Sequence, residues 1–376
     1  MRFIISSTAL SSRLQTLSRV ISNKNSLPIL DSFLFEVSNG QLTLTTSDSE
    51  NVMQTTIQTD ECEGDGAFAL TSQTILDAMK ELPEQPLQFS VNIDQATITI
   101  IYQGGEYNFT ILNADEYPRM HSTLDNVNVI TLDALVLCDN INRSAFAMGS
   151  DELRPVMNGI YFDLGADALS IVASDGHKLV RNRNLTVKSE TPASFILPKK
   201  PALLLKNVLG KDGGDVVIKF DNRNAEIRFA DGILTCRLIE GRYPNYNSVI
   251  PQNNPNQLTI DRKGLLSALK RVLPFGSKSS QLVKFRLDAG TLELSSEDID
   301  YATKAKETII CDYNGQKMCI GFKGSSLTEI LGNLDGDEVV IELADPSRAG
   351  IIVPAQQPEN EDVLMLLMPM LLSDQN

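Results

Sequence analysis

The feature that most constrains this chain is a threefold internal repeat. Four blocks of sequence recur in the same order, at intervals of roughly 125 residues. An interval of this length is close to the commonest size of a protein domain. The 376 residues are therefore expected to fold as three copies of one unit.

The first two blocks predict a strand and an amphipathic helix, followed by a β-hairpin. The strand and helix begin at Phe3, Val129 and Leu258, and leucines of the first copy recur at the spacing of one helix face. The hairpin contains triplets in which apolar and polar residues alternate, as they do in half-buried strands. These triplets are residues 42–44, 169–171 and 292–294.

The last two blocks predict a second helix between strands, and then a closing hairpin. The second helix lies in blocks that begin at Phe68, Phe195 and Cys319, and glycine or proline follows it each time. The fold class expected is therefore α+β, with two helices packed on antiparallel sheets of roughly eight strands in each unit. Polar turns at Asn126 and Asn247 place the domain boundaries, which give domains at 1–126, 127–247 and 248–376.

The net charge of −15 argues at face value against a nucleic-acid partner. The charge is unevenly distributed, however. The six segments expected to be helical contain 15 basic and 7 acidic residues, so they carry +8 and the remainder carries −23. A basic helical face suits salt-sensitive contact with phosphates of any sequence, although basic residues also simply favour helices. Most of the basic charge lies on Arg13, Arg19, Lys24, Lys199, Lys200, Lys206, Lys211, Arg262, Lys263, Lys270, Arg271 and Lys278.

The size of one unit indicates how many would be needed to surround DNA. A domain of this length is roughly 30 Å across, so three in a triangle leave almost no hole. Six in a hexagon leave a hole of roughly 30 Å, which admits a duplex. Three units in each chain therefore predict a closed dimer with twofold symmetry.

The residue types that enzymes and metal sites require are sparse here. The five cysteines are scattered without a C-x-x-C pair, which favours buried free thiols over disulfides or zinc. Ser174, Asp175 and His177 adjoin in sequence, whereas a catalytic triad comes from separated elements. The glycines of 212–215 lack the spacing of a phosphate-binding loop. We expect no catalytic residue, no metal and no cofactor.

Neither end of the chain predicts a membrane segment. The apolar run at residues 3–5 is shorter than the core of a signal peptide, and the run at 363–372 is about half of a membrane helix. A cytoplasmic protein with no membrane partner is expected.

Five motifs now give a resemblance to a known family. NKNSLPIL at 23–30, RPVMNG at 154–159, SDGHKL at 174–179, EGRYPNY at 240–246 and MPM at 368–370 are similar to those of the bacterial DNA polymerase III beta subunit, the sliding clamp. The resemblance covers essentially the whole chain. It implies a head-to-tail homodimeric ring that encircles duplex DNA, is opened by a clamp loader, and tethers the polymerase III catalytic subunit. It also implies that the chain itself does no chemistry.

The resemblance further implies a pocket between the second and third domains for the short binding motif of polymerases, loader and repair proteins. Methionine and leucine make an adaptable apolar groove for several partner peptides, although the terminal Met-Leu run could instead be only a core strand. The family's pattern departs at Leu371 and the further residues to Asn376, and at Pro155 and Val156. The pocket residues implied are Met157, Ser174, Gly176, His177, Lys178, Leu179, Pro244, Ser248, Val249, Leu366, Met368, Pro369 and Met370.

The same resemblance implies sites for DNA and for the second copy. The DNA-binding residues implied are Lys24, Arg154, Lys199 and Lys200, and the dimer interface would set Tyr107, Phe109 and Ile111 against Leu273 and Phe275. The competing hypothesis is a three-domain scaffold that binds peptides and does not encircle DNA.

Overall fold

The computed structural model describes residues 1–22, 24–25, 27–119, 124–210 and 213–372. Its contacts divide the chain into two compact units. Unit 1 comprises Met1–Cys138 and Lys200–Leu238, and unit 2 comprises Asp139–Lys199 and Ile239–Asn376. The division runs through the second of the three repeats. Lys211 and the C-terminal residues 373–376 lie outside the described residues.

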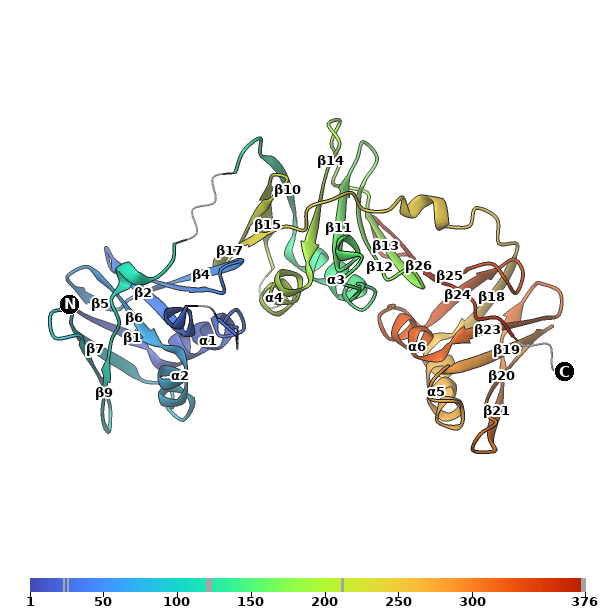
Figure 1. Ribbon diagram of the computed structural model, residues 1–376, viewed down its shortest axis with the longest axis horizontal. Helices are drawn as coiled ribbons and strands as arrows, with labels where there is room; N and C mark the ends of the chain where they lie inside the picture. Colours follow the sequence, from blue (N-terminus) through green and yellow to red (C-terminus); the bar gives the residue numbers. More distant parts are fainter. Residues whose placement is uncertain (23, 26, 120–123, 211–212, 373–376) are drawn as a thin grey trace. The chain divides into compact units, whose positions relative to one another are not determined.

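Unit 1 contains a five-stranded antiparallel sheet in the order β5-β1-β7-β8-β9 and an eight-stranded one in the order β10-β15-β16-β17-β4-β3-β2-β6, within the described ranges. Helices α1 and α2 lie side by side against them (Figure 1). The elements are β1 Arg2–Ser6, α1 Ser7–Leu17, η1 Pro28–Asp31, β2 Ser32–Ser38, β3 Gln41–Ser47, β4 Asn51–Gln58, β5 Glu61–Glu63, β6 Gly66–Thr71, α2 Ser72–Lys80, β7 Pro86–Asn92, β8 Thr97–Tyr102, β9 Gly105–Thr110, η2 Ala114–Glu116, β10 Asn128–Asp133, α4 Lys199–Leu209, β15 Asp215–Phe220, β16 Asn224–Phe229 and β17 Gly232–Arg237.

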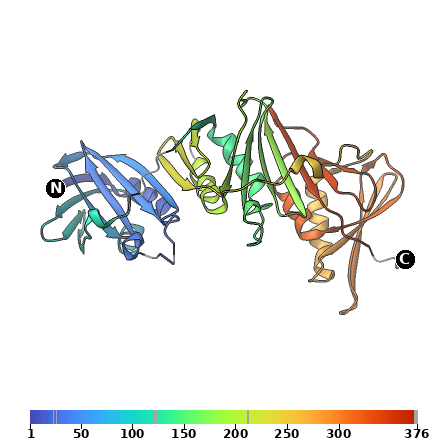
Figure 2. The ribbon, with the colours of Figure 1, turned by 45° about the horizontal axis from the view of Figure 1, so that its top comes forward.

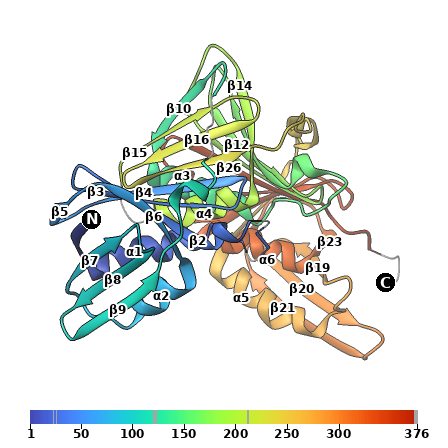
Figure 3. The same ribbon diagram turned by 60° about the vertical axis from the view of Figure 1, so that its left-hand side comes forward.

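Unit 2 contains a nine-stranded sheet in the order β14-β11-β12-β13-β26-β25-β24-β18-β22 and a four-stranded one in the order β21-β20-β19-β23, again within the described ranges. Helices α5 and α6 lie side by side (Figure 3), and α3 begins in unit 1 and ends in unit 2. The elements are α3 Ala134–Ala145, η3 Pro155–Met157, β11 Gly159–Leu164, β12 Leu169–Ser174, β13 Lys178–Asn184, β14 Ala193–Pro198, η4 Tyr246–Val249, β18 Asn256–Asp261, α5 Arg262–Val272, η5 Leu273–Phe275, β19 Leu282–Asp288, β20 Thr291–Asp298, β21 Thr303–Ile310, β22 Asp312–Tyr313, β23 Met318–Lys323, α6 Gly324–Gly332, β24 Glu338–Leu343, β25 Gly350–Pro354 and β26 Glu361–Leu367.

The predicted α+β class, with helices packed on antiparallel sheets in three repeats, is confirmed. Local sequence explains where the helices begin. In α1 the Ser6 hydroxyl accepts a hydrogen bond from the N–H of Ala9, and Leu10, Leu14 and Leu17 are fully buried along one face. The Asp261 carboxylate caps α5 in the same way.

The helices are shorter than the sequence suggests, and this changes the charge that they carry. α1 ends at Leu17, so Arg19 and Lys24 follow it, and Lys278 lies beyond α5 and η5. The observed helices contain ten basic and three acidic residues, a net charge of +7. The helices are therefore cationic, as predicted.

Consecutive repeats are joined by pairs of antiparallel strands. In unit 1, β4 pairs with β17 and Met53 lies opposite Leu234. In unit 2, β13 pairs with β26 and Val180 lies opposite Met365. Figure 2 shows the second joint, where the red β26 continues the sheet of green strands. These two joints position the candidate site.

The two joints have the same register. Met53 and Val180 occupy equivalent places, because they pair across their hairpins with Thr46 and Ala173, which each follow the repeated triplet by two residues. Leu234 and Met365 are also equivalent. Each is the last in a row of three residues that lie opposite one another on the final three strands of a repeat. These rows are Ile218–Ile227–Leu234 and Ile341–Ile352–Met365. The strand pairing between consecutive copies is therefore itself repeated.

Candidate functional site

A tight turn between β12 and β13 brings several predicted pocket residues together. The Ser174 hydroxyl donates to the carbonyl of Lys178 (2.9 Å) and accepts from the N–H of Gly176, and the Asp175 carboxylate accepts from the N–H groups of His177 and Lys178. Gly176 has φ +92°, a backbone conformation that favours glycine. The SDGHK sequence therefore specifies a turn that exposes His177 and buries Ser174.

The C-terminal segment passes directly beside this turn. Leu179 lies opposite Leu366 in the β13–β26 pair, and the N–H of Met368 donates to the carbonyl of His177 (2.9 Å). Two residues further on, the N–H of Met370 donates to the carbonyl of Gly321 at 2.8 Å. The MPM motif is thus held at both ends by backbone hydrogen bonds.

Beneath these residues lies a cluster of buried apolar side chains in unit 2. Aromatic rings form one wall, since Tyr161 and Tyr243 stack in parallel with centroids 4.6 Å apart and Tyr246 meets Tyr161 edge-on. The Tyr246 hydroxyl donates to the carboxylate of Asp163 at 2.9 Å. The buried members are Val172, Leu179, Ile196, Tyr243, Tyr246, Ile250, Ala349, Ile351, Leu364 and Leu366, with Val156, Tyr161, Ile239 and Val353 partly buried against them.

Other predicted pocket residues lie exposed around this cluster. Val249 is 55% exposed and Met368 is 40% exposed, which is high for apolar side chains so close to a core. Pro244 and Ser248 are exposed on the segment that carries Tyr243 and Tyr246. Met157 differs, since it is buried and its neighbour Val156 is the residue that packs on the cluster.

Charged groups fix the edge of the site. The Lys178 ammonium lies 2.9 Å from the Glu329 carboxylate of α6 and 3.3 Å from that of Asp175, and 5.7 Å from the centre of the Phe146 ring. Arg154, expected to contact DNA, pairs with Asp151 at 2.9 Å. A Cβ at Gly176 would lie 3.1 Å from Nη1 of Arg154, so this arginine also borders the turn of the pocket.

Sequence reasoning missed the tyrosine wall. Tyr161, Tyr243 and Tyr246 were not among the predicted pocket residues, although the EGRYPNY motif contains two of them. The signal that could have found them is the spacing Tyr-Pro-x-Tyr in a linker, because exposed linkers rarely carry aromatic residues that need burial. Burial raises the pKa of both Tyr243 and Tyr246, so the two phenols remain neutral.

The four predicted DNA-contacting residues differ in whether other groups of the chain already pair with their charges. Lys24 and Lys199 are exposed, and neither has an ion pair within the described part of the chain. The Lys200 ammonium instead donates to the carboxylate of Asp48 and to the carbonyl of Val20 (2.6 Å). Lys200 therefore fastens α4 to the β3–β4 turn of the preceding repeat, and less of its charge is available to phosphate.

This contact gives a pH-dependent stability. Burial disfavours the ionised Asp48, but hydrogen bonds from Lys200 and Asn51 outweigh burial and lower the pKa of this carboxyl below its ordinary 3.8. Because the pKa of Asp48 is lower in the folded state, ionisation of this carboxyl stabilises the fold. The contribution is fully present above pH 3.8 and is lost as the pH falls below that value.

We expect Asp48→Asn to lower the free energy of unfolding by about 1 kcal/mol at pH 7, because the pair is partly exposed. Urea unfolding of both proteins at pH 7 and at progressively lower pH tests this. The difference between them should shrink as the medium becomes acidic. A difference that stays constant down to the lowest pH at which both fold would contradict the assignment.

The predicted interface residues lie at two sheet edges. β9, which carries Tyr107 and Phe109, is the last strand of the five-stranded sheet, and β21, which η5 contacts, is the last strand of the four-stranded one. Tyr107 stacks with Phe109 at 6.0 Å, and Phe275 is 46% exposed. Ile111 differs from the other four, because it is already buried at 4% exposure.

The described residues contain no group of three or more His, Cys, Asp or Glu placed to hold a metal ion. Among them, the five cysteines are free thiols. No helix in the described ranges is long and apolar enough to cross a membrane.

Comparison with known proteins agrees with this architecture. Models of the N-terminal, central and C-terminal domains of the DNA polymerase III beta subunit match residues 1–121, 131–245 and 247–371. The beta sliding clamp of Pseudomonas putida is 26% identical, over 99% of this chain and 100% of its own length. That of Haemophilus influenzae is 25% identical, over 97% of this chain and 99% of its own length.

Solved structures give the same result for the fold. The DNA polymerase III beta subunit of Thermotoga maritima has a TM-score of 0.89 at 25% identity, and covers 99% of this chain and 100% of its own. That of Pseudomonas aeruginosa has a TM-score of 0.91 at 24% identity with the same coverage. The chain belongs to the DNA polymerase III beta subunit family, the sliding clamps that serve as non-catalytic processivity factors.

Proposed function

We propose that this chain forms a head-to-tail homodimeric ring around duplex DNA and tethers its partners through the pocket in unit 2. The partners are the polymerase III catalytic subunit, the clamp loader and other replication and repair proteins that carry the clamp-binding motif. The domains are 1–126, 127–247 and 248–376. The observation that carries the proposal is the common register of the two joints between repeats.

The register of the internal joints supports a third joint, between two chains. Tyr107 ends the row Phe89–Ile100–Tyr107, which is equivalent to the rows that end at Leu234 and Met365. Ala305 lies opposite Ser296 and is the equivalent of Met53 and Val180. A second copy that continues the repeat would therefore place its Tyr107 opposite Ala305, with β9 antiparallel to β21.

The partial exposure of the aromatic residues on β9 supports this joint. In the internal joints, Leu234 and Cys236 of β17 are fully buried, whereas their equivalents Tyr107 and Phe109 are only half-buried in one chain. An unpaired strand edge is a template for pairing with another chain. Pairing β9 with β21 would bury these rings and leave neither edge open.

The oligomeric mass of the full chain tests this part of the proposal. Sedimentation equilibrium should give a mass of twice 41.3 kDa, because each chain has one β9 edge and one β21 edge. A monomer at every accessible concentration would contradict a ring of two chains.

The pocket is proposed from its combination of a buried floor and exposed apolar rim. A partner peptide would bury Val249 and Met368 over the tyrosine wall, and the backbone near His177 would orient it. Leu371 is 89% exposed just beyond the MPM motif, so this chain offers one more apolar contact at the rim.

The DNA contacts are proposed from the cations that lack ion pairs within the described residues. Lys199→Gln should lower the slope of log affinity against log salt by about one, because the side chain would no longer neutralise a phosphate. Lys200→Gln is the matched control, since the neighbouring ammonium is bound to Asp48 and Val20. The measurement is binding to a short duplex at several salt concentrations. Equal slopes for wild type and Lys199→Gln would remove Lys199 from the DNA site.

A further inference from the structure

The outer edge of β10 is open, whereas the equivalent edges in the other two repeats are covered. β10 is the last strand of the eight-stranded sheet and pairs, among the described residues, with β15 alone. The equivalent strands are β1 and β18, because the residues that end the three strands, Ser6, Asp133 and Asp261, all cap the helix that follows. β5 covers β1, and β22 covers β18. Of these three described strands, only β10 therefore lacks a covering strand.

The length of one connection explains why the covering strand is missing. Thr59, Ser189 and Cys311 are equivalent, because the N–H of each donates to a carbonyl in the turn of the first hairpin of its repeat. Six residues separate Thr59 from β6 and Cys311 from β23, and they include β5 and β22. Three residues separate Ser189 from β14, and the last is Pro192, which has no N–H. The second repeat therefore has no room for a covering strand in this connection.

The backbone of β10 directs hydrogen-bonding groups toward the open edge. The N–H of Ala134 donates to the carbonyl of Gly214 (2.8 Å), and hydrogen-bonded pairs alternate along an antiparallel ladder. Every second residue of β10 therefore directs its N–H and C=O to β15, and those of Val129 and Thr131 face outward. An edge of this kind is a template for another strand.

The equivalent edge in the first repeat shows what the open edge lacks. The carbonyl of Ile4, which is equivalent to Thr131, accepts a hydrogen bond from the N–H of Asp60 at 2.9 Å. Ile4 is half-buried, whereas Thr131 and Val129, which lie on one face of β10, are exposed. Val129 is 53% exposed. Natural edge strands are commonly very short or charged, and the centre of β10 is neither.

The two covering strands indicate what kind of segment fits this edge. Both run antiparallel to the strand that they cover, and they are three and two residues long. In the first repeat, Glu63 of β5 lies opposite Arg2. The equivalent of Arg2 in the second repeat is Val129. A segment that covers β10 therefore needs an apolar residue where β5 has an acidic one.

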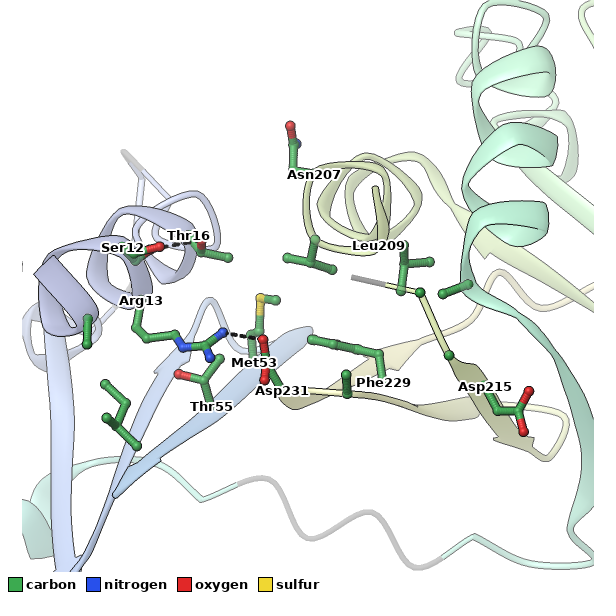
Figure 4. Close-up of a pocket in the computed structure, with 17 residues that line it drawn as sticks. Ser12, Arg13, Thr16, Met53, Thr55, Asn207, Leu209, Asp215, Phe229 and Asp231 are labelled. Atoms are coloured by element: carbon green, nitrogen blue, oxygen red, sulfur yellow. Dashed lines mark hydrogen bonds and ion pairs between the residues drawn. The ribbon is translucent and has the colours of Figure 1, made fainter. Parts of the chain in front are cut away.

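Acidic side chains lie at both ends of the open edge. Asp133 lies opposite Asp215 at one end, both are exposed, and Asp125 is exposed shortly before the other end. Figure 4 shows the carboxylate of Asp215 pointing away from the ion pair of Arg13 and Asp231. Within the described part of the chain, none of the three carboxylates at the edge has an ion pair. Basic residues at the two ends of a covering segment would complement them.

We propose that the open edge of β10 binds an extended peptide of a partner protein, which adds one short antiparallel strand to the eight-stranded sheet. The peptide has apolar residues opposite Val129 and Thr131, and a basic residue at each end, near Asp133 and Asp125. Its main chain supplies the hydrogen bonds, and its alternate side chains supply the specificity. The site lies in unit 1, shares no residue with the partner pocket of unit 2, and requires neither that pocket nor the ring.

The test uses the peptide Lys-Thr-Val-Thr-Val-Thr-Lys with a fluorescent label, whose anisotropy is followed on titration with the full chain. Its valines and lysines fall on one face of a strand, and we expect saturable binding at low salt. N-methylation of both valine amides removes the donors directed at β10 and should weaken binding at least about tenfold. N-methylation of the first and last threonine amides, which face away from β10, is the matched control. Glutamate in place of both lysines should weaken binding about fivefold.

Variants of the chain locate the site. Thr131→Pro removes an outward N–H, which a strand edge tolerates, and should abolish binding. Val129→Lys should weaken binding about fivefold, and Ile93→Lys, at a residue of similar exposure in unit 1, should bind as wild type does. Thermal unfolding establishes that each variant is folded, and Val129→Lys decides alone if Thr131→Pro is not.

Several results would overturn the proposal. The first is the absence of saturable binding by the lysine-ended peptide. Equal binding of the two methylated peptides would show that the main chain of the peptide does not pair with β10. Wild-type affinity in the folded Thr131→Pro and Val129→Lys variants would remove the site from this edge, and equal binding of the glutamate-ended peptide would rule out a basic partner.

Discussion

Replacing Tyr107 and Phe109 together by lysine is expected to convert the dimer into monomers. In the third joint, Tyr107 would lie opposite Ala305, on the face of β21 that points away from Lys304 and Lys306. In each joint the variant removes the burial of two aromatic rings and places two charges in the contact that buried them. The loss of burial alone is about 3–6 kcal/mol for each joint. Because a closed ring of two chains contains two such joints, the dissociation constant should rise by at least about ten-thousandfold.

A matched variant on the other face of the same strand provides the control. Asn108 and Thr110 are exposed, and alternate along β9 with the two aromatic residues. Asn108→Glu with Thr110→Glu adds the same number of charges to the strand, sets the first of them opposite Lys304, and should leave the dimer largely intact. Sedimentation equilibrium on both double variants tests the joint. A dimer of unchanged strength in the aromatic variant would show that β9 is not an interface.

Replacing Val249 and Met368 by alanine is expected to weaken binding of a clamp-binding-motif peptide by about 2–4 kcal/mol. Both side chains are exposed around the buried cluster, so their truncation removes contact area without opening a cavity in the core. Leu179 is a poorer probe. It is 2% exposed, and Leu179→Ala would cost about 2–5 kcal/mol of stability as well as any contact.

The control for this variant is Ile93→Ala. Ile93 is 51% exposed, similar to Val249, and belongs to unit 1, whereas the cluster belongs to unit 2. Isothermal titration with the peptide should give wild-type affinity for the control and a much lower affinity for the double variant. Equal affinity for the double variant and wild type would remove both residues from the pocket.

The repeat allowed the fold to be predicted because each copy repeats its hydrophobic pattern. Leu10, Leu14 and Leu17 were expected on one helix face and are fully buried. The helix ends were less well predicted. The apolar residue Val20 is buried, but it lies in the turn that follows α1, and its hydrophobicity alone does not separate a turn from a helix.

Contacts between distant parts of the chain could not be predicted from local sequence. Lys200 and Asp48 are 152 residues apart, so nothing near Lys200 indicates that its ammonium is already bound. The same holds for Arg143 and Glu361, whose burial depends on the register of β26. The net helical charge therefore has the predicted sign, but overstates the charge available to phosphate.

Which strands pair between consecutive repeats could not be predicted from sequence patterns either. Gly232 shows why, because a Cβ at this residue would lie 2.3 Å from the carbonyl of Gln54 on β4. The glycine is required by a neighbouring strand in the preceding repeat, and its role becomes clear only once β4 and β17 are paired. Such close approach is a property of the assembled joint.

The central claim is that two chains form a closed ring whose hold on DNA is topological. The most direct measurement is release of the clamp from nicked circular DNA after loading, at low and at high salt, and again after the circle is cut once. Encirclement predicts slow release from the circle at both salt concentrations and rapid loss from the linear product, because only free ends allow a closed ring to slide off. Rapid salt-driven release from intact circles, with no effect of cutting, would instead support a scaffold held on DNA by charge alone.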